Sequence, residues 1–318
     1  MTPPLRLLAV LAHPDDESLG FGGTIARYAA EGVETFVLTA TRGQSGRFRG
    51  IPKGDPGHPG PEALARIREG ELRAAVEVLG IRESILLDYM DGRLDEAPHD
   101  EAIGIVAKTI RRLRPQVVIT FAWDGAYGHP DHIAVCQFAI AACVAAADPA
   151  SRLPGLEGST AHAVSKIYVM ATTQAMWDAY QWAFKKLTST VDGVERQAVA
   201  WPDWMPTTRI DTRAQWERVW KAVSCHDSQI AAYERLHQLS PEHHEALWGS
   251  MNFYRVFSTV NGGRRHETDL FEGLREAEPA RPEAKLEGLQ PEAKLDGLQP
   301  EAKLEGFQPE AKLEGFQK

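Results

Sequence analysis

Cysteine is scarce in this sequence. Its 318 residues include only Cys136, Cys143 and Cys225, an odd number without a CxxC spacing. A disulfide framework requires paired cysteines in an oxidising compartment, so we expect none and interpret the three thiols as small core residues in a reducing compartment. With 43% hydrophobic residues, the chain is long enough to bury a core without cross-links.

Long hydrophobic runs are also missing. The apolar run near the N-terminus ends at Ala12, too early for a secretory signal. No stretch approaches the roughly 20 apolar residues of a membrane span. We therefore expect a cytoplasmic protein that does not use a membrane as its partner.

Positive charge is in deficit, with 35 Lys and Arg against 44 Asp and Glu and a formal net charge of −9. Nucleic acids and acidic membranes bind through basic patches, so neither is expected as the main partner. The sequence leaves the oligomeric state open, a homo-oligomer included.

A short repeat fills the C-terminal end. Residues 282–318 are four copies of a nine-residue unit, PEAKLEGLQ, PEAKLDGLQ, PEAKLEGFQ and PEAKLEGFQ, followed by Lys318. Nine residues rotate a helix by roughly 900°, which places the leucines of successive units, Leu286 and Leu295, on opposite sides. Because every unit also carries a proline and a glycine, a flexible tail is predicted. The alternative is a repeat that binds an unknown partner.

Strand-like and helix-like segments alternate along the rest of the chain. Strands are predicted at residues 5–11, 33–41, 84–89, 116–121 and 164–170. Helices are predicted between them, at residues 16–32, 61–80, 100–114 and 133–147. This order is typical of an α/β protein with a Rossmann-like, doubly wound and mostly parallel sheet.

Two polar clusters follow the first and fourth predicted strands, "HPDDE" from His13 and "GHPDH" ending at His132. Ligands of such sheets bind beyond the carboxyl ends of the strands, so the two clusters can meet although they lie far apart in sequence. His13 and Asp16 are spaced i,i+3, as are His129 and His132. Two imidazoles and one carboxylate leave a position open for water, the arrangement of hydrolytic Zn²⁺, with Fe²⁺ as the alternative because non-haem iron uses the same donors.

Helix capping or nucleotide binding would account for part of this pattern. A lone "HPD" is a common helix start, because Asp and Pro favour first turns, but two such motifs at two strand ends favour a metal site. A nucleotide-binding site is suggested by "GFGG", yet Gly20, Gly22 and Ile25 miss the third position of GxGxxG, and no acidic residue closes the second strand.

The motifs "AHPDDE" and "YGHPDH" together resemble the LmbE-like or PIG-L family of zinc-dependent N-deacetylases, which remove acetyl from N-acetylglucosamine conjugates. The resemblance covers Leu5 to Leu274 and includes "ARIREGELRAAVEVLG", "VSCHDSQ" and "ETDLFEGL". The repeat tail has no counterpart. Within the family, the chain looks most like the actinobacterial-type enzymes that act on N-acetylglucosaminyl-inositol and the related thiol-conjugate amidases.

The resemblance implies metal ligands and a general base. His13, Asp16 and His132 would bind the metal. Asp15 would take a proton from the metal-bound water and later deliver it to the leaving amine. A carboxylate suits this task if a partly apolar site raises its pKa. Glu17 would either orient a histidine or favour the helix N-terminus.

The resemblance also implies groups that stabilise the oxyanion. His129, held by Asp131 on its other ring nitrogen, would be a positively charged donor to the tetrahedral oxyanion. Tyr127 would add a second donor to the same oxygen.

Substrate contacts have a weaker signal. Arg68, Arg42 and His226 match family positions near the sugar and its aglycone, although an arginine on an amphipathic helix is more often a solvated or salt-bridged residue. Asp88 and Asp91, just past the third strand, either hold sugar hydroxyls or only end the strand. Many family members carry an acidic residue where this chain has Gln44, a departure that leaves the identity of the sugar or aglycone open.

We predict three regions, a Rossmann-like metal-hydrolase core over 1–170, a C-terminal cap over 171–281 that sets specificity, and the tail over 282–318. The cap holds seven of the eight tryptophans. Five of them are candidates for a wall that stacks on a sugar, with core packing as the favoured interpretation: Trp201, Trp204, Trp216, Trp220 and Trp248.

The predicted function is a zinc-dependent sugar N-deacetylase with a small amino-sugar substrate. The alternatives are an amidase that cleaves a larger acyl group or a thiol conjugate from glucosamine, and a non-catalytic zinc-binding scaffold.

Deleting residues 282–318 should leave turnover unchanged, because every predicted site residue lies before the tail. The measurement is kcat/KM of the truncated and full-length proteins under the same conditions. A large loss of activity would contradict the interpretation of the repeat as an accessory tail.

Overall fold

The computed structural model describes residues 4–184, 188–191, 193–197, 199–231, 233–260 and 266–275. The repeat over 282–318 lies outside the described residues, so the flexible tail stays a prediction.

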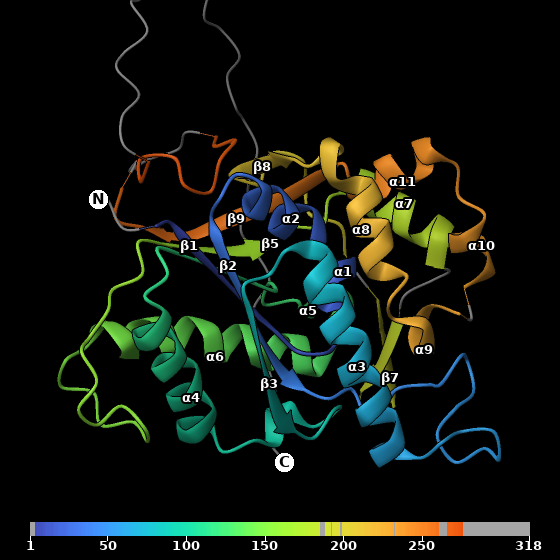
Figure 1. Cartoon of the computed structure of the whole chain (residues 1–318), viewed down its shortest axis with the longest axis horizontal. Coiled ribbons are helices and arrows are strands. Elements are labelled where there is room, and N and C mark those ends of the chain that lie inside the picture. Colours follow the sequence, from blue (N-terminus) through green and yellow to red (C-terminus); the bar gives the residue numbers. More distant parts are fainter. Residues whose placement is uncertain are drawn as a thin grey trace, which may run out of the picture. The chain divides into compact units, whose positions relative to one another are not determined.

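A seven-stranded mixed sheet organises the fold in the order β3-β2-β1-β4-β5-β9-β8 (Figure 1). The first five strands in this order run parallel, and β9 and β8 pair antiparallel. The strand bounds are β1 Arg6–Leu11, β2 Glu34–Thr41, β3 Glu83–Tyr89, β4 Val117–Thr120, β5 Lys166–Met170, β8 Thr208–Asp211 and β9 Ser250–Ser258. A separate hairpin consists of β6 Thr188–Val191 and β7 Val194–Gln197. The predicted α/β class with a doubly wound, mostly parallel sheet is confirmed.

Strand β1 lies at the centre of the sheet, which explains its continuous apolar sequence. Leu8 pairs with Phe36 of β2 on one side and with Val118 of β4 on the other. The residues from Leu7 to Ala12 are completely buried. A parallel strand covered on both faces has no polar side to alternate with. The chain order reverses between β1 and β4, and at such a switch point the loops after the strands leave room for a ligand.

Helices cover both faces of the sheet. The helix α4 packs beside α6 on one face, and α2 and α3 pack on the other, where α8 contacts both (Figure 1). Pro61 starts α3 with a preset φ, and Gly80 ends it in the left-handed region at φ +76°. The α-helix bounds in this part are α1 Asp16–Leu19, α2 Gly22–Ala30, α3 Pro61–Leu79, α4 His99–Leu113, α5 Gly125–Gly128 and α6 Pro130–Ala147, with the 3-10 helix η1 over Leu94–Glu96.

The first predicted helix, over 16–32, is wrong in one respect because it divides into α1 and α2. The glycines that follow α1 serve packing. A Cβ on Gly23 would lie 2.9 Å from the side chain of Thr212 and 3.0 Å from the carbonyl oxygen of Trp248. The glycines of "GFGG" therefore allow α2 to approach the C-terminal region, which removes the main support for the nucleotide-binding alternative.

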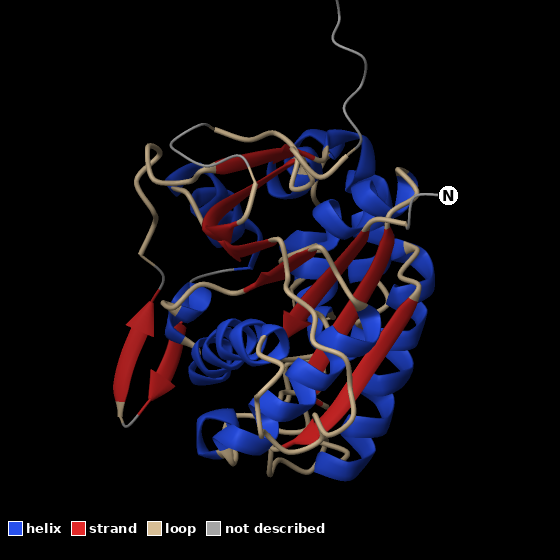
Figure 2. Ribbon diagram, turned by 90° about the vertical axis from the view of Figure 1, so that its left-hand side faces the viewer, coloured by secondary structure: helices blue, strands red, loops and turns tan. Residues whose placement is uncertain are grey.

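The C-terminal region is built around short helices and completes the sheet. Its helices are α7 Gln174–Phe184, α8 Trp216–Val223, α9 Asp227–Ile230, α10 Glu234–His237 and α11 Pro241–Trp248, with the 3-10 helix η2 over Arg213–Gln215. Because β9 and β8 add to the edge strand β5, this region shares the sheet of the preceding one (Figure 2). The boundary at residue 170 between core and cap stays a prediction.

Within the described ranges, α6 is the one helix long and apolar enough to cross a membrane by length and composition. Its packing against α4 and the sheet gives it the position of a core helix, and just over half of it, 56%, is buried.

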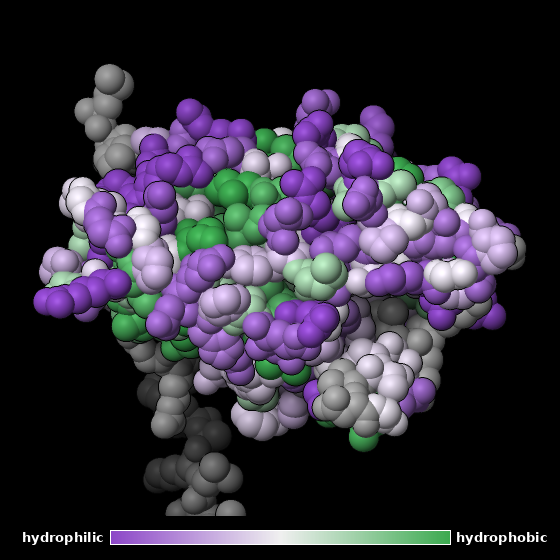
Figure 3. Space-filling view, turned by 90° about the horizontal axis from the view of Figure 1, so that it is seen from below, coloured by the Kyte–Doolittle hydropathy of each residue, from purple (hydrophilic) through white to green (hydrophobic). Residues whose placement is uncertain are grey.

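Hydrophilic side chains cover most of the face shown in Figure 3, with hydrophobic ones in smaller areas between them.

A buried ionic network fastens the segment 266–275 to the sheet. Glu267, 1% exposed, accepts hydrogen bonds from Lys166 Nζ at 2.7 Å and Tyr168 Oη at 2.6 Å. It also pairs with Arg255 Nη1 at 2.8 Å. Burial opposes the charge on Glu267, but the bonds from Lys166 and Tyr168 outweigh it and lower its pKa.

Glu267→Gln should lower the free energy of unfolding by about 3 kcal/mol, because it removes the negative charge that pairs with buried Lys166. The pKa of Glu267 is lower in the folded protein than in the unfolded chain, where it is about 4. Glu267 therefore stabilises the fold fully above this pH, and the stabilisation is lost as the pH falls further. Denaturant titrations between pH 3 and pH 7 should show the gap to wild type closing at acid pH. Exposed Glu157→Gln is the control, and a constant gap across this range would contradict the assignment.

Candidate metal centre and active site

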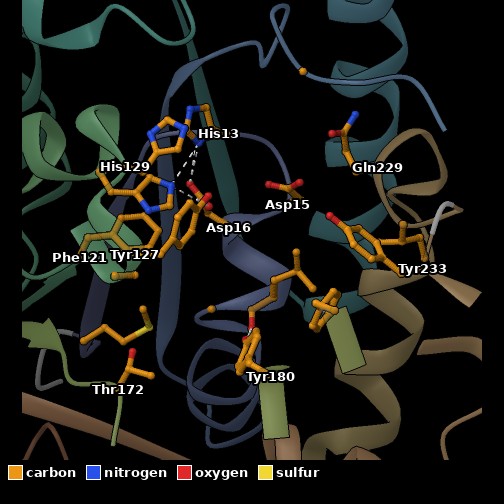
Figure 4. Close-up of a pocket in the computed structure, with 18 of the residues that line it drawn as sticks. His13, Asp15, Asp16, Phe121, Tyr127, His129, Thr172, Tyr180, Gln229 and Tyr233 are labelled. Atoms are coloured by element: carbon orange, nitrogen blue, oxygen red, sulfur yellow. Dashed lines mark hydrogen bonds and ion pairs between the residues drawn. The ribbon is translucent and has the colours of Figure 1, made fainter. Parts of the chain in front are cut away.

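The two polar clusters meet at the carboxyl ends of β1 and β4, as their strand positions predict. Residues His13 to Asp16 follow β1 and lead into α1, whereas His129 and His132 belong to the start of α6. Figure 4 shows the side chains of His13, His129 and Asp16 pointing toward one another, with Asp15 beside them.

Three side chains form a group that can hold a metal ion: His13, Asp16 and His132. His13 Nδ1 lies 3.6 Å from Asp16 Oδ2 and 3.3 Å from His132 Nε2. His132 Nε2 lies 3.5 Å from Asp16 Oδ1. Tetrahedral ligands at zinc distances lie ~3.4 Å apart, and these separations, which involve both carboxylate oxygens of Asp16, are of that size.

The second ring nitrogen of His13 faces carboxylates. Its Nε2 lies 3.0 Å from Asp131 Oδ2 and 3.2 Å from Asp91 Oδ1. An ionised carboxylate only accepts hydrogen bonds, so Nε2 carries the proton and Nδ1 keeps a lone pair for a metal. Burial lowers the pKa of His13, but Asp131, Asp16 and Asp91 outweigh it and raise the pKa well above its usual value. The cluster thus favours positive charge at its centre.

The expected pairing of Asp131 with His129 is wrong. The Asp131 carboxylate is fully buried and accepts from Gly92 N at 2.7 Å and Leu94 N at 2.9 Å, in addition to His13. The hydrogen bond between His129 and Asp131 comes from the Asp131 backbone, whose N–H donates to His129 Nδ1 at 3.2 Å. The cause is the helix start, where His129 is the N-cap of α6 and its ring turns back over the first turn.

A second group, His13, His129 and Asp131, also has donor atoms close enough for a metal. Its atoms already accept hydrogen bonds from the backbone. The Asp131 carboxylate accepts from two N–H groups, and His129 Nδ1 accepts from a third. The group with Asp16 is therefore the better metal site.

Phe121 is a site residue that sequence reasoning did not identify. Its ring stacks on His132 with centroids 3.8 Å apart and planes 11° from parallel. The ring of His129 also stacks on His132, with centroids 4.7 Å apart. Stacking fixes the plane of the His132 ring, and the position of Phe121 directly after β4 was the available signal.

Adjacent carboxylates occupy opposite environments. Asp16 Oδ2 accepts from Ala12 N at 3.1 Å and His13 N at 2.8 Å. Burial opposes the charge on Asp16, but His132 and His13 outweigh it and lower its pKa. Asp15, by contrast, has its pKa raised to about 6, mainly by burial and against the attraction of Arg68. Two carboxylates whose pKa values diverge in this way suit different roles.

The backbone explains how neighbours reach such different surroundings. Asp15 has φ +111°, a region that side chains other than glycine rarely adopt. Its N–H donates to Glu17 Oε2 at 2.9 Å, which holds the turn. A strained residue of this kind at a polar cluster indicates a constraint imposed by function.

Buried Arg68 holds Asp15 in place. Its Nη2 lies 3.1 Å from Asp15 Oδ2 and also donates to the carbonyl of Pro14, while Nη1 donates to the carbonyl of Gly43 at 2.9 Å. Arg68 therefore joins the loops after β1 and β2 at the site.

Glu17 orients a histidine, the first of its two expected roles. Its Oε1 lies 2.6 Å from Nε2 of His226, and both side chains are fully buried. His226 is thus placed behind the site and is not among the residues that line the pocket, so its expected contact with substrate stays a prediction.

The site opens into a cavity of about 330 Å³. On the metal side it is lined by His13, Asp15, Asp16, Arg68, Asp91, Phe121, Tyr127, His129 and His132. Tyr127 lies in α5 next to Ala126, which has a positive φ of +66°, as Asp15 does. Its ring stands edge-on to His129 at 5.8 Å and to His132 at 5.5 Å.

Comparison with known sequences shows the family. Residues 8–143 match the family profile "PIG-L: GlcNAc-PI de-N-acetylase". The 1D-myo-inositol 2-acetamido-2-deoxy-alpha-D-glucopyranoside deacetylase of Geodermatophilus obscurus is 35% identical in an alignment 297 residues long, which covers 86% of this chain and 99% of that protein. The chain belongs to the PIG-L family. The predicted recognition and the predicted class, an amide hydrolase of the deacetylase type, are confirmed.

Solved structures share the PIG-L fold. A conserved protein from Thermus thermophilus is 27% identical, with a TM-score of 0.56 over 81% of this chain and 97% of the other. The N,N'-diacetylchitobiose deacetylase of Pyrococcus horikoshii is 20% identical, with a TM-score of 0.58 over 79% of this chain and 83% of the other, a likeness of fold alone.

Of the five residues predicted to contact substrate, Arg68 and Asp91 line the pocket of this PIG-L protein. Arg42 and Asp88 instead pair with each other, Nε to Oδ1, at 2.8 Å, and Asp88 is 79% exposed at its side chain. Neither residue lines the cavity, so this structure gives no support to their expected substrate contact. Gln44 also lies outside it, and its amide donates to the carbonyl of Tyr89 at 3.1 Å.

None of the five candidate tryptophans lines the pocket. Trp201 and Trp248 are buried, Trp216 and Trp220 pack against the cluster around Trp248, and Trp204 is 78% exposed. Core packing is thus the better interpretation for most of them. Trp177, which was not singled out, does line the cavity.

His132→Ala should abolish tight metal binding, because it removes one of three ligands. Asp131→Asn should weaken metal affinity by about 10- to 100-fold, since it disturbs the partner that orients His13. Chelator competition with metal analysis checks both. Exposed His243→Ala is the control, and a His132→Ala protein that keeps wild-type affinity would exclude this group as the metal site.

Proposed function

We propose that this PIG-L protein is a zinc-dependent N-deacetylase that removes the acetyl group from an N-acetylglucosamine conjugate. The observation that carries the proposal is the group His13, Asp16 and His132, with tetrahedral donor spacing, beside Asp15 at the floor of a cavity. These ligands also suit Fe²⁺, but a redox-inert ion is sufficient for hydrolysis.

When bound, the ion supplies a Lewis acid for the acetyl carbonyl and acidifies a water. The chain supplies the proton transfer. Asp15 takes a proton from the attacking water and gives it to the sugar nitrogen as the C–N bond breaks, leaving acetate and a primary amine. Arg68 holds the Asp15 carboxylate in one orientation for both steps.

His129 and Tyr127 face the position where negative charge develops. Because the Asp131 N–H donates to His129 Nδ1, the proton of His129 lies on Nε2, and the ring is a neutral donor. Burial and the neighbouring His13 lower its pKa to about 4, which favours the same state. The expectation of a positively charged His129 is therefore replaced by a neutral hydrogen-bond donor to the oxyanion. Burial raises the pKa of Tyr127, so its phenol keeps a proton to donate.

The relatives suggest the first substrate to test. The protein of Geodermatophilus obscurus and that of Kineococcus radiotolerans, 34% identical over 313 residues, both carry the name of a deacetylase of an N-acetylglucosaminyl-inositol. We propose this class of small amino-sugar conjugate as substrate and the cytoplasm as the location.

The experiment is release of primary amine by the zinc-loaded protein from N-acetylglucosamine, its inositol and malate glycosides, chitobiose and a thiol-conjugated amide. Release from a sugar acetamide supports the deacetylase, and release only from the thiol conjugate favours the amidase alternative. Metal binding without release from any compound would favour the scaffold alternative.

Asp15→Asn should lower kcat by about 10²- to 10⁴-fold, because the general base is lost while the ligands remain. Metal content, measured in parallel, should stay at the wild-type level. Exposed Asp88→Asn provides the same chemical change away from the cavity and should keep its activity. Near-normal turnover in the Asp15 variant would remove this residue from the role of base.

A further inference from the structure

The cavity has a second wall of a different character. Opposite the histidines and carboxylates it is lined by apolar and aromatic residues: Leu19, Met170, Met176, Trp177, Tyr180, Phe184, Ile230 and Tyr233. Figure 4 shows the separation, with His13 and His129 on one side, Tyr180 and Tyr233 on the other, and Asp15 between them. We call these eight residues the apolar wall.

Helix α7 contributes half of the apolar wall. Met176, Tyr180 and Phe184 are spaced i, i+4 and i+8, and Trp177 lies three residues before Tyr180. Residues at this spacing form one continuous stripe along a helix. The polar residues of α7 point elsewhere, as shown by Gln174, whose amide bonds to Asp178 at 2.7 Å.

The apolar wall is held firmly from behind. Phe184 and Ile230 belong to a buried cluster with Val219, Leu236 and Trp248, and Leu19, Tyr180 and Tyr233 pack against it. The rings of Tyr180 and Phe184 stack with centroids 5.4 Å apart. A surface supported by a packed core keeps its shape when a ligand arrives.

Two of the polar groups on this side are engaged by the protein. The hydroxyl of Tyr180 donates to the carbonyl of Leu19. The amide nitrogen of Gln229 donates to the carbonyl of Arg47 at 2.9 Å and contacts Ser228 Oγ at 3.0 Å. A sugar or inositol hydroxyl turned toward these engaged groups would lose its hydrogen bonds to water and find few new ones. The transfer of an alkyl or aryl group from water to this wall would instead be favourable.

We propose that the apolar wall is a subsite for an apolar group of the substrate, a short alkyl chain or a ring, carried next to the acetamide that is cleaved. This proposal rests on the proposed function and defines its substrate class more narrowly. Two sources supply the same chemistry, an acyl chain longer than acetyl or an apolar aglycone on the sugar.

Two matched substrate series distinguish the sources in the zinc-loaded full-length protein. One series varies the acyl group of the methyl glycoside, from acetyl to butanoyl to hexanoyl. The other keeps acetyl and varies the aglycone, from methyl to butyl to phenyl. We expect kcat/KM to rise about fourfold per buried methylene in one series. A rise in neither series overturns the proposal.

Near-isosteric polar variants test the wall itself. Met176→Gln and Leu19→Asn should remove the gain from the apolar group while leaving kcat/KM for the methyl glycoside acetamide within about twofold of wild type. Met205→Gln is the matched control, because Met205 packs in another cluster outside the cavity lining. An unchanged gain in both wall variants would overturn the proposal.

Binding measured without turnover separates this inference from the proposed function. Calorimetry compares methyl, butyl and phenyl glucosaminides, the amine products, on zinc-loaded wild type and Met176→Gln. Tighter binding of the apolar glycosides, lost in the variant, supports an aglycone subsite even if no acetamide is hydrolysed. Hydrolysis of the methyl glycoside without any apolar gain in rate or binding would keep the deacetylase and overturn the subsite.

Discussion

The hydrogen bond between the Asp131 carboxylate and Nε2 of His13, 3.0 Å long, joins the two strand ends on which the metal centre is built. It holds the His13 proton on the outer nitrogen, so Nδ1 turns toward Asp16 and His132. The N–H groups of Gly92 and Leu94 fix Asp131 in turn, which ties the loop after β3 to the same point. The donor set therefore depends on three loops held together by one buried carboxylate.

Neighbouring positions in the chain have separate chemical tasks because the backbone turns sharply between them. The left-handed φ of Asp15 sends its carboxylate to Arg68, whereas Asp16 stays under backbone N–H groups and the histidines. Burial dominates at Asp15 and raises its pKa, and positive neighbours dominate at Asp16 and lower its pKa. Two adjacent aspartates can thus serve as a base, Asp15, and as a metal ligand, Asp16, because their environments differ.

The two sides of the cavity come from different parts of the chain. Loops after the parallel strands provide the charged side, which carries out hydrolysis, while α7 and the segment from α9 to Tyr233 provide most of the apolar wall. The residues of the metal group and those of the apolar wall therefore lie on separate segments of the chain.

Local patterns in the sequence determined the fold class, the five parallel strands with the helices between them, and the two i,i+3 motifs that carry the candidate metal ligands, because hydrophobic periodicity, turn residues and i,i+3 spacing act over a few residues. The family resemblance then implied which three of these residues bind the metal. The patterns could not determine which partners meet across the sheet. Asp131 faces His13 and not His129, His226 is buried behind Glu17, and Arg42 pairs with Asp88 outside the cavity. The stripe of Met176, Tyr180 and Phe184 became a cavity wall only when α7 packed beside α10 and α11. Such pairings depend on distances between segments far apart in the chain, and only the tertiary structure sets those distances.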